Sequence, residues 1–416
     1  MNVAVVAEFY PSRGDPVLGV WAHRQAIAVR DAGAQPYVLV LHRIVPPRAA
    51  LHAGPEQAAR ALMRLAREPR RQLRDGLEVR YVPYISPPRD RSYDAWGAWA
   101  APALALALRA LARRVRLDLI HAHNAIPAGD AVRRARMALP LVVSVHGGDV
   151  FHTAHRLARG HAAVARALGA ARLTLANSEG IAQLARAHGA LQTRVVHLGA
   201  AQPAHAALAG RAYRPGRADH PARAAHLRGA SPNREHPSLV TVGHLVARKR
   251  HADVVRALAV LSERHPTLRY VIIGEGPERD SLVRLARRLG VSERVELRGQ
   301  LEPEAALEQA RACTLFVMPS TEEAFGVAYI EAMAAGMPAI GCRGEPGPDE
   351  IAAAGGGFLL VPPGDIERLS QLIDELLRDP QTLREAGRRA RQTVAESFSW
   401  ERCGAQTLAA YREALR

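Results

Sequence analysis

Short apolar runs alternate with helical patterns along most of this chain of 416 residues, and no other feature of the sequence restricts its fold as strongly. The apolar runs are short enough to be buried strands, and the stretches between them place apolar residues at helical spacing. Such alternation is typical of a parallel sheet that is covered by helices on both faces. We therefore expect an α/β fold.

The alternation falls into two series, each long enough for a doubly wound domain. In the first series, strands are expected at 3–7, 37–41, 77–82, 119–122, 141–145, 172–176 and 195–198, and helices at 20–32, 103–115, 154–168 and 181–188. In the second series, strands are expected at 239–242, 269–273, 295–298, 315–318, 339–342 and 358–361, and helices at 252–265, 279–289, 303–311, 327–335, 366–377 and 380–396. We predict an N-terminal domain over 1–199 and a C-terminal domain over 238–399.

The pattern fails between the two series. Residues 200–237 are rich in Pro, Gly, His and Arg and have little apolar periodicity, so we expect an interdomain linker with an insertion. One more helical pattern, at 400–416, follows the last strand of the second series. We expect this helix to cross back to the first domain.

The chain is strongly basic, with 56 Lys and Arg residues against 40 Asp and Glu residues and a formal charge of +16. The arginines are spread over many short clusters, no nucleic-acid-binding motif is recognisable, and aromatic residues make up only 5% of the chain. We therefore expect no nucleic-acid partner. A diffuse positive surface suits an anionic substrate and an anionic membrane surface equally well.

Cysteine use and apolar segments bear on location. The three cysteines are scattered, which fits a reducing compartment and predicts neither a disulfide framework nor a zinc site. The first residues show no signal peptide. The apolar stretch at 95–112 contains Pro102 and Arg109, so we expect a surface or core helix, with an interfacial membrane helix as the alternative. We expect a cytoplasmic protein that can attach peripherally to the inner face of the membrane.

The stretch 319–338, PSTEEAFGVAYIEAMAAGMP, has a buried strand pattern before it and another after it, which predicts a βαβ crossover. Glu323 and Glu331 lie eight residues apart, which is ~12 Å at helical rise and matches the reach from the sugar to the ribose of a sugar nucleotide. The backbone amides at 325–328 would begin the helix and suit a phosphate. The alternative is a solvated pair of charges on an ordinary helix.

A basic loop follows the first strand of the second series, in the sequence VGHLVARKRH. Arg248, Lys249 and Arg250 stand before a helix, where they could meet a diphosphate. Lys249 is the only lysine in the chain, which suggests a need for a compact ammonium group on phosphate. The alternative is a solvated loop in which this lysine survived by chance. We interpret the GEGP sequence at 274–277 as a structural turn near the nucleotide.

In the first series, the sequence VVSVHGGDVF places His146 directly after a strand. A histidine beside two glycines can line a cleft and hydrogen-bond a sugar hydroxyl; the alternative is a satisfied histidine at a strand end. His121 and His123 share one face of a strand, and we interpret them as packing or cleft-lining residues. The sequence shows neither a DxD spacing nor a third metal ligand beside these histidines. We therefore expect no metal site.

Together these motifs resemble the retaining glycosyltransferases of family 4. Glu323 and Glu331 match that family's E-x7-E signature, and the sequences VGHLVARK, GEGP, HGGD and FSWERC occur in the expected order. The resemblance covers nearly the whole chain and is strongest at 239–361. It implies the GT-B fold, in which two Rossmann-like domains face each other across a cleft.

The resemblance also implies roles for individual residues. Glu323 would hold hydroxyls of the donor sugar, Glu331 the ribose, and Lys249 the diphosphate, with the amides of Gly326 and Val327 helping.

Further expected contacts lie elsewhere in the chain. His146 would line the sugar and acceptor side, the loop from Gly14 to Gly19 would close over the phosphates, and Arg298 and Gly299 would lie near the base.

One position departs from the family pattern. The family usually carries an arginine directly after the glycine of the VG pair, and here His244 occupies that position. Arg248 or Arg250 would then supply the missing positive charge, or the site would bind the donor more weakly. His244 is kept among the expected donor-binding residues.

The implied activity is transfer of a sugar from a UDP-, GDP- or ADP-sugar to a hydroxyl of a sugar, polysaccharide or lipid-linked acceptor, with retention of configuration and without a metal or other cofactor. Glu323 and His146 are the expected catalytic residues. Alternatives of the same fold are a sugar-nucleotide epimerase and a phosphorylase, although the latter would need a lysine for pyridoxal phosphate. The alternative of another class is a non-catalytic basic binding protein or a degenerate transferase subunit.

Overall fold

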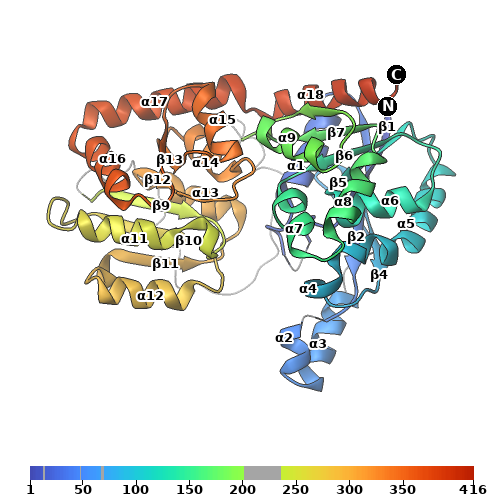
Figure 1. The fold of residues 1–416 in the computed structure, drawn as a ribbon, viewed down its shortest axis with the longest axis horizontal. Helices are drawn as coiled ribbons and strands as arrows, with labels where there is room; N and C mark the ends of the chain where they lie inside the picture. Colours follow the sequence, from blue (N-terminus) through green and yellow to red (C-terminus); the bar gives the residue numbers. More distant parts are fainter. Residues whose placement is uncertain (13–14, 47, 67–69, 201–235) are drawn as a thin grey trace. The chain divides into compact units, whose positions relative to one another are not determined.

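The computed structural model describes residues 1–12, 15–46, 48–66, 70–200 and 236–416. The expected linker at 200–237 lies outside these residues except at its ends, and so does Gly14. The chain divides into two compact units (Figure 1). Unit 1 comprises Met1–Leu198 together with Trp400–Arg416, and unit 2 comprises Gly199–Ser399.

Unit 1 contains an eight-stranded sheet in the order β3-β4-β2-β1-β5-β6-β7-β8. All neighbouring strands are parallel except β3 and β4, which pair antiparallel at one edge. The strands are β1 (Asn2–Ala7), β2 (Gln35–Arg43), β3 (Arg71–Arg74), β4 (Leu77–Tyr84), β5 (Leu119–His123), β6 (Leu141–Val145), β7 (Leu173–Ala176) and β8 (Thr193–Val195).

The helices of unit 1 are α1 (Val20–Asp31), α2 (Arg48–His52), α3 (Pro55–Ala66), α4 (Arg89–Ser92), α5 (Trp96–Ala112), α6 (Asp130–Ala135), α7 (Ala154–Arg156), α8 (Gly160–Gly169), α9 (Glu179–Ala187) and α18 (Trp400–Ala414), with short helical turns η1 (Tyr93–Ala95), η2 (Ala125–Gly129) and η3 (Asp149–Thr153). In Figure 1 the red helix α18 lies among the elements of unit 1.

The single helix expected at 154–168 is wrong. The chain leaves the helical conformation at Leu157, and a new helix begins at Gly160. A Cβ atom at Gly160 would lie 1.7 Å from the carbonyl oxygen of Thr153, so the chain can turn this closely only at a glycine.

Unit 2 contains a six-stranded, all-parallel sheet in the order β11-β10-β9-β12-β13-β14. The strands are β9 (Ser238–Val242), β10 (Arg269–Ile273), β11 (Val295–Gly299), β12 (Leu315–Val317), β13 (Ala339–Cys342) and β14 (Phe358–Val361). The helices are α11 (His251–Val260), α12 (Arg279–Arg288), α13 (Pro303–Arg311), α14 (Val327–Ala334), α15 (Pro346–Ala354), α16 (Ile366–Arg378) and α17 (Pro380–Ser397), with short turns η5 (Ala247–Lys249) and η6 (Ser292–Arg294). The predicted α/β class, built on two parallel sheets, is confirmed.

The loops at the carboxyl ends of β9, β10 and β11 are joined by backbone hydrogen bonds. The amide of Leu245 donates to the carbonyl of Glu275 at 3.0 Å, and the amide of Gly274 donates to Gly299 at 2.9 Å. Gly274 has a φ of +149°, and a Cβ atom there would lie 2.0 Å from the carbonyl oxygen of Gly243. The GEGP segment is therefore a structural turn packed on the preceding loop, as expected.

Candidate active site

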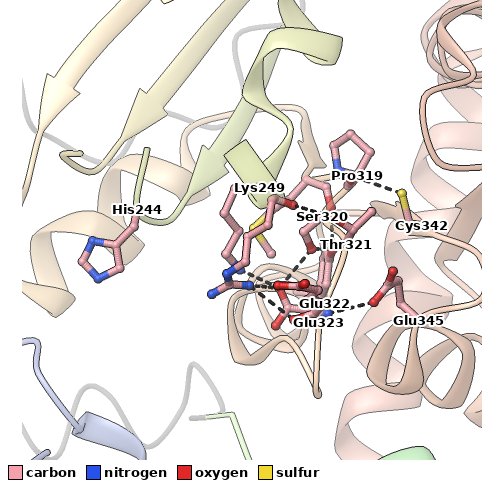
Figure 2. A network of polar contacts seen from close by, with 12 residues as sticks. His244, Lys249, Pro319, Ser320, Thr321, Glu322, Glu323, Cys342 and Glu345 are labelled. Atoms are coloured by element: carbon pink, nitrogen blue, oxygen red, sulfur yellow. Dashed lines mark hydrogen bonds and ion pairs between the residues drawn. The ribbon is translucent and has the colours of Figure 1, made fainter. Parts of the chain in front are cut away.

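Lys249 and Glu323 form an ion pair in unit 2. The ammonium nitrogen of Lys249 lies 2.5 Å from Oε2 of Glu323, although 74 positions of sequence separate the residues (Figure 2). The lysine ends the short turn η5 after β9, and the glutamate lies in the loop after β12. Because β9 and β12 are neighbours in the parallel sheet, the loops at their carboxyl ends meet.

The Glu323 loop is fixed by a buried polar network. The Ser320 hydroxyl donates to Oε2 of Glu323 at 2.9 Å and is itself 2.9 Å from the hydroxyl of Tyr329 on α14. The backbone amide of Glu323 donates to a carboxylate oxygen of Glu345 at 2.8 Å (Figure 2). The amide of Gly347 donates to the carbonyl of Glu323 at 3.2 Å. Both the side chain and the backbone of Glu323 are therefore held in one position.

The carboxylate of Glu323 is ionised at neutral pH. Burial alone would raise its pKa, but the charge and hydrogen bond of Lys249, together with Arg248 and Ser320, hold the pKa below its ordinary value. All of these contacts reach Oε2. Oε1 has no hydrogen-bond partner among the described residues, so one carboxylate oxygen is anchored and the other is left without a partner.

Arg248 is the arginine that supports this pair. Its guanidinium nitrogen lies 4.0 Å from Oε2 of Glu323, and it donates to the carbonyl of Glu322 at 3.4 Å. Arg250, the other expected replacement for the missing family arginine, instead pairs with Asp253 at 2.6 Å on α11. The structure therefore favours Arg248 over Arg250 as the second positive charge.

His244 lies apart from the ion pair. Its side chain is exposed, and Figure 2 shows its ring directed away from Lys249 and Glu323. Its backbone carbonyl accepts a hydrogen bond from His251 at 3.2 Å, so its main chain shapes the basic loop. Donor binding by the His244 ring stays a prediction.

The helix α14 begins directly after the glutamate loop. Gly326 precedes it with a φ of +93°, and a Cβ atom there would lie 2.2 Å from the ring of Tyr329, so only glycine fits. The amides of Gly326 and Val327 make no hydrogen bond to any described residue, as expected for the free amino end of a helix. The helix begins only at Val327, so the continuous helix assumed in the estimate of ~12 Å between Glu323 and Glu331 is absent, and that separation stays a prediction.

Three other expected donor-binding residues belong to other elements of the fold. Arg298 and Gly299 end β11, two strands from β9, and the Arg298 guanidinium pairs with Glu296 on its own strand. Gly19 lies in unit 1, where its φ of +71° and the backbone of Phe9, 2.2 Å from where its Cβ would lie, explain why it is glycine. Their roles in donor binding stay predictions.

His146 follows β6 in unit 1 and is half-buried, in a row with the buried histidines His123 and His121. Its Nε2 is 3.0 Å from Nδ1 of His123, and the two rings are stacked. His121 continues the row, with its ring centre 4.5 Å from that of His123, and it is hydrogen-bonded to Tyr411 at 2.8 Å. Burial lowers the pKa of His146 to about 4, so its imidazole is neutral at neutral pH. Its Nδ1 is buried without a partner among the described residues.

The histidine row is formed by residues at two neighbouring strands, β5 and β6, and was not expected. The sequence patterns assigned His121 and His123 to packing or to cleft lining, and His146 separately to the cleft. Because β5 and β6 are parallel neighbours, their ends bring His123 and His146 together. Within the described ranges, no group of three or more His, Cys, Asp or Glu residues is arranged to hold a metal ion.

Two family models match the sequence. The model described as Glycosyltransferase Family 4 matches residues 58–200, and the model described as Glycosyl transferases group 1 matches residues 225–393. The two matches cover most of unit 1 and most of unit 2, respectively.

Several curated relatives are glycosyltransferases by name. The D-inositol 3-phosphate glycosyltransferase of Nocardia farcinica is 33% identical, over 72% of this chain and 67% of the relative. The lipopolysaccharide core biosynthesis glycosyltransferase LpsE of Rhizobium meliloti is 32% identical, over 40% of this chain and 46% of the relative. A GDP-mannose-dependent monoacylated alpha-(1-6)-phosphatidylinositol monomannoside mannosyltransferase of Corynebacterium glutamicum is 31% identical, over 40% and 45%. The chain thus matches less than half the length of two of these three relatives.

Solved structures resemble the whole chain. A sucrose-phosphate synthase from Thermosynechococcus elongatus has a TM-score of 0.73 at 21% identity and covers 99% of this chain and 98% of its own. The Anabaena protein HepE in complex with UDP-glucose has a TM-score of 0.64 at 18% identity and covers 100% of both chains. These likenesses show the fold, and the family models and the Nocardia relative show the family. The chain belongs to the glycosyltransferases of family 4 and has their GT-B fold.

Proposed function

We propose that this protein transfers a sugar from a nucleoside diphosphate sugar to a hydroxyl group of a sugar, polysaccharide or lipid-linked acceptor, with retention of configuration and without a metal ion. The proposal covers UDP-, GDP- and ADP-sugars as donors. The Corynebacterium relative is named for GDP-mannose, and HepE binds UDP-glucose, so relatives support nucleotide sugars without selecting one base.

The observation that carries the proposal is the unequal environment of the two Glu323 oxygens. Oε2 is held by Lys249 and Ser320, whereas Oε1 has no partner among the described residues. An ionised carboxylate oxygen is a strong acceptor for a sugar hydroxyl. Glu323 would therefore orient the donor sugar, while its partner Lys249 reaches the diphosphate.

The chemistry that these residues supply is stabilisation of a leaving diphosphate. As the glycosidic bond breaks, negative charge grows on the phosphate oxygens and an oxocarbenium-like sugar forms. Lys249, with Arg248 beside it, and the free amides of Gly326 and Val327 are fixed donors that can meet that charge. A phosphate oxygen would then take the proton of the attacking hydroxyl on the same face of the sugar, which retains the configuration.

We extend the proposal to Glu331, His146 and three further donor contacts. Glu331 would bind the ribose, and the buried Nδ1 of the neutral His146 would hydrogen-bond a sugar hydroxyl on the acceptor side. Arg298, Gly299 and the loop that ends at Gly19 would complete the donor site near the base and the phosphates.

The relatives named for lipopolysaccharide and phosphatidylinositol mannoside support an acceptor in polysaccharide, lipopolysaccharide or glycolipid synthesis. We place the enzyme in the cytoplasm, at the inner face of the membrane when the acceptor is carried on a lipid.

A donor screen followed by a transfer assay tests the proposal. We expect one class among UDP-, GDP- and ADP-sugars to raise the melting temperature, and the same sugar to be transferred or slowly hydrolysed. Glu323→Gln should lose this activity, whereas Glu322→Gln, the same chemical change one residue earlier in the loop, should keep most of it. A protein that binds none of these donors, and binds DNA at moderate salt instead, would contradict the proposal in favour of a basic binding protein.

A further inference from the structure

The apolar helix α5 of unit 1 has one buried and one exposed face. Its buried face, which includes Gly97, Leu104 and Leu108, packs on α6, β2 and β4. A Cβ atom at Gly97 would lie 2.5 Å from a carboxylate oxygen of Asp130 on α6, so the two helices are in close contact. Figure 1 shows α5 at the outer side of its unit, beside α6.

The exposed face of α5 begins apolar and ends basic. Trp99, Pro102, Leu106, Arg109 and Arg113 follow one another at steps of three and four residues, which places them on a single side of the helix. Trp99 is 51% exposed and Leu106 is 69% exposed, which is unusual for two large apolar side chains on one face.

The charges on this face are of one sign. The helix contains no acidic residue, and Arg109 and Arg113 form no ion pair with any residue of the described ranges. The next arginine, Arg114, is different because it pairs with Glu78 at 3.0 Å. Unpaired arginines beside exposed Trp and Leu side chains complement a surface that has an anionic outer layer over an apolar interior.

Length and composition alone would allow a membrane span at Tyr93–Ala112, where the mean hydropathy is 1.3. However, 44% of the most apolar part of this segment is buried inside the unit, so lipid cannot surround the helix while unit 1 stays folded. A helix that is buried on one side can meet a bilayer only by lying along its surface.

We propose that the exposed face of α5, formed by Trp99, Pro102, Leu106, Arg109 and Arg113, docks on an anionic lipid bilayer. The helix axis lies parallel to the bilayer plane, with Trp99 and Leu106 at the level of the acyl chains and both arginines at the phosphate groups. This surface shares no residue with the proposed sugar-transfer site, so its test needs no activity.

Vesicle sedimentation of the full chain tests the proposal. The protein should sediment with vesicles of equal parts phosphatidylglycerol and phosphatidylcholine, and far less with pure phosphatidylcholine or at high salt. Trp99→Ser with Leu106→Ser should lower the partition coefficient at least about tenfold. Arg109→Gln with Arg113→Gln should lower it roughly fivefold for each arginine removed.

Two matched controls distinguish the effect of changing this face from the effect of removing any exposed arginine or apolar side chain. Arg287→Gln with Arg288→Gln removes the same charge from exposed positions of α12 in unit 2. Leu191→Ser with Val260→Ser removes side chains that are 76% and 61% exposed. We expect both controls to bind vesicles like the unchanged protein. Equal losses in the controls, or no sedimentation with anionic vesicles at low salt, would overturn the proposal.

Self-association is the other outcome that would overturn it. If the chain forms dimers in analytical ultracentrifugation, and Trp99→Ser with Leu106→Ser abolishes these dimers while vesicle binding is absent, a second copy covers the face. Because all four residues changed on α5 have exposed side chains, their substitution should leave the melting temperature of the protein unchanged.

Discussion

The Lys249–Glu323 ion pair predicts a loss of stability whose size depends on pH. In Lys249→Met the side chain keeps its length and loses its charge, so the Glu323 carboxylate keeps only Ser320 and the more distant Arg248. Removing one partner of a fully buried ion pair costs about 3–5 kcal/mol. The two side chains are 12% and 11% exposed and Arg248 stays 4.0 Å away, so we expect the free energy of unfolding to fall by about 2 kcal/mol at neutral pH.

The sign of the pH dependence follows from the pKa of Glu323. In the unchanged protein this folded-state pKa lies below the ordinary value of 4.5, so the stabilisation is present above that pH and is lost as the pH falls through the folded-state pKa. In Lys249→Met, burial without the lysine moves the pKa of Glu323 upward, so stability is lost as the pH rises. The difference between the two proteins should be about 2 kcal/mol at about pH 8 and should disappear only when the pH falls below the folded-state pKa of Glu323 in the unchanged protein.

The assay must report on unit 2, and tryptophan fluorescence does not. All four tryptophans, Trp21, Trp96, Trp99 and Trp400, belong to unit 1. Unit 2 instead contains the buried cysteines Cys313 and Cys342, whereas the third cysteine, Cys403, is buried in unit 1. Urea unfolding can therefore be followed by labelling with a dipyridyl disulfide, which also reacts at acidic pH, and reading each cysteine by mass spectrometry. Cys403 serves as the internal control.

A double-mutant cycle supplies the matched control. In the Glu323→Gln background there is no carboxylate to leave unpaired, so Lys249→Met should destabilise unit 2 by less than about 0.5 kcal/mol at either pH. An equal loss at acidic and neutral pH, or the same loss in the Glu323→Gln background, would refute the reasoning, because the ion pair would then contribute nothing beyond packing.

Three further changes test the site. Glu323→Gln should lower kcat by roughly 10²–10³ while the donor KM does not rise, because Lys249 is released toward the diphosphate; initial rates measure both, and near-normal turnover would exclude the sugar-orienting role. Lys249→Ala should weaken donor binding about tenfold or more, and Lys249→Arg should restore only part of it in calorimetry. A full rescue by arginine would contradict the argument from the single lysine. Gly326→Ala should destabilise unit 2 by about 2–4 kcal/mol in the cysteine-labelling assay, because of its positive φ and the contact with the Tyr329 ring. An unchanged stability would show that the beginning of α14 can rearrange.

The two parallel sheets could be predicted because apolar periodicity is a local property of the chain. The antiparallel edge strand β3 (Arg71–Arg74) could not be predicted in this way. Two of its four residues are arginines, its first and third residues are exposed, and it contains no apolar run. The helix α15 (Pro346–Ala354) was also missed, because its opening PGP is typical of a loop although a proline fits the first turn of a helix.

The site could be predicted residue by residue but not as a set of contacts. The basic loop predicted a phosphate contact for Lys249, and the family resemblance implied a sugar contact for Glu323, but neither implies that the two form an ion pair. That contact depends on β9 lying beside β12, which is a property of strand order and not of periodicity. Glu345 and the histidine row of unit 1 were missed for the same reason, because their partners come from other loops. Ser320 was missed although its partner Glu323 lies in the same loop.

The position of α18 (Trp400–Ala414) sets the order in which the two units can be completed during synthesis. Its Tyr411 is fully buried in unit 1 against His121, and Gly404 lies so close to α1 that a Cβ atom would be 2.1 Å from the carbonyl of Ala28. Unit 2 is continuous in sequence, whereas unit 1 needs a helix that the ribosome makes only after all of unit 2. Unit 2 can therefore fold first, while the residues of unit 1 that α18 covers stay exposed. Truncation before Trp400 should make unit 1 sensitive to proteases and leave unit 2 intact.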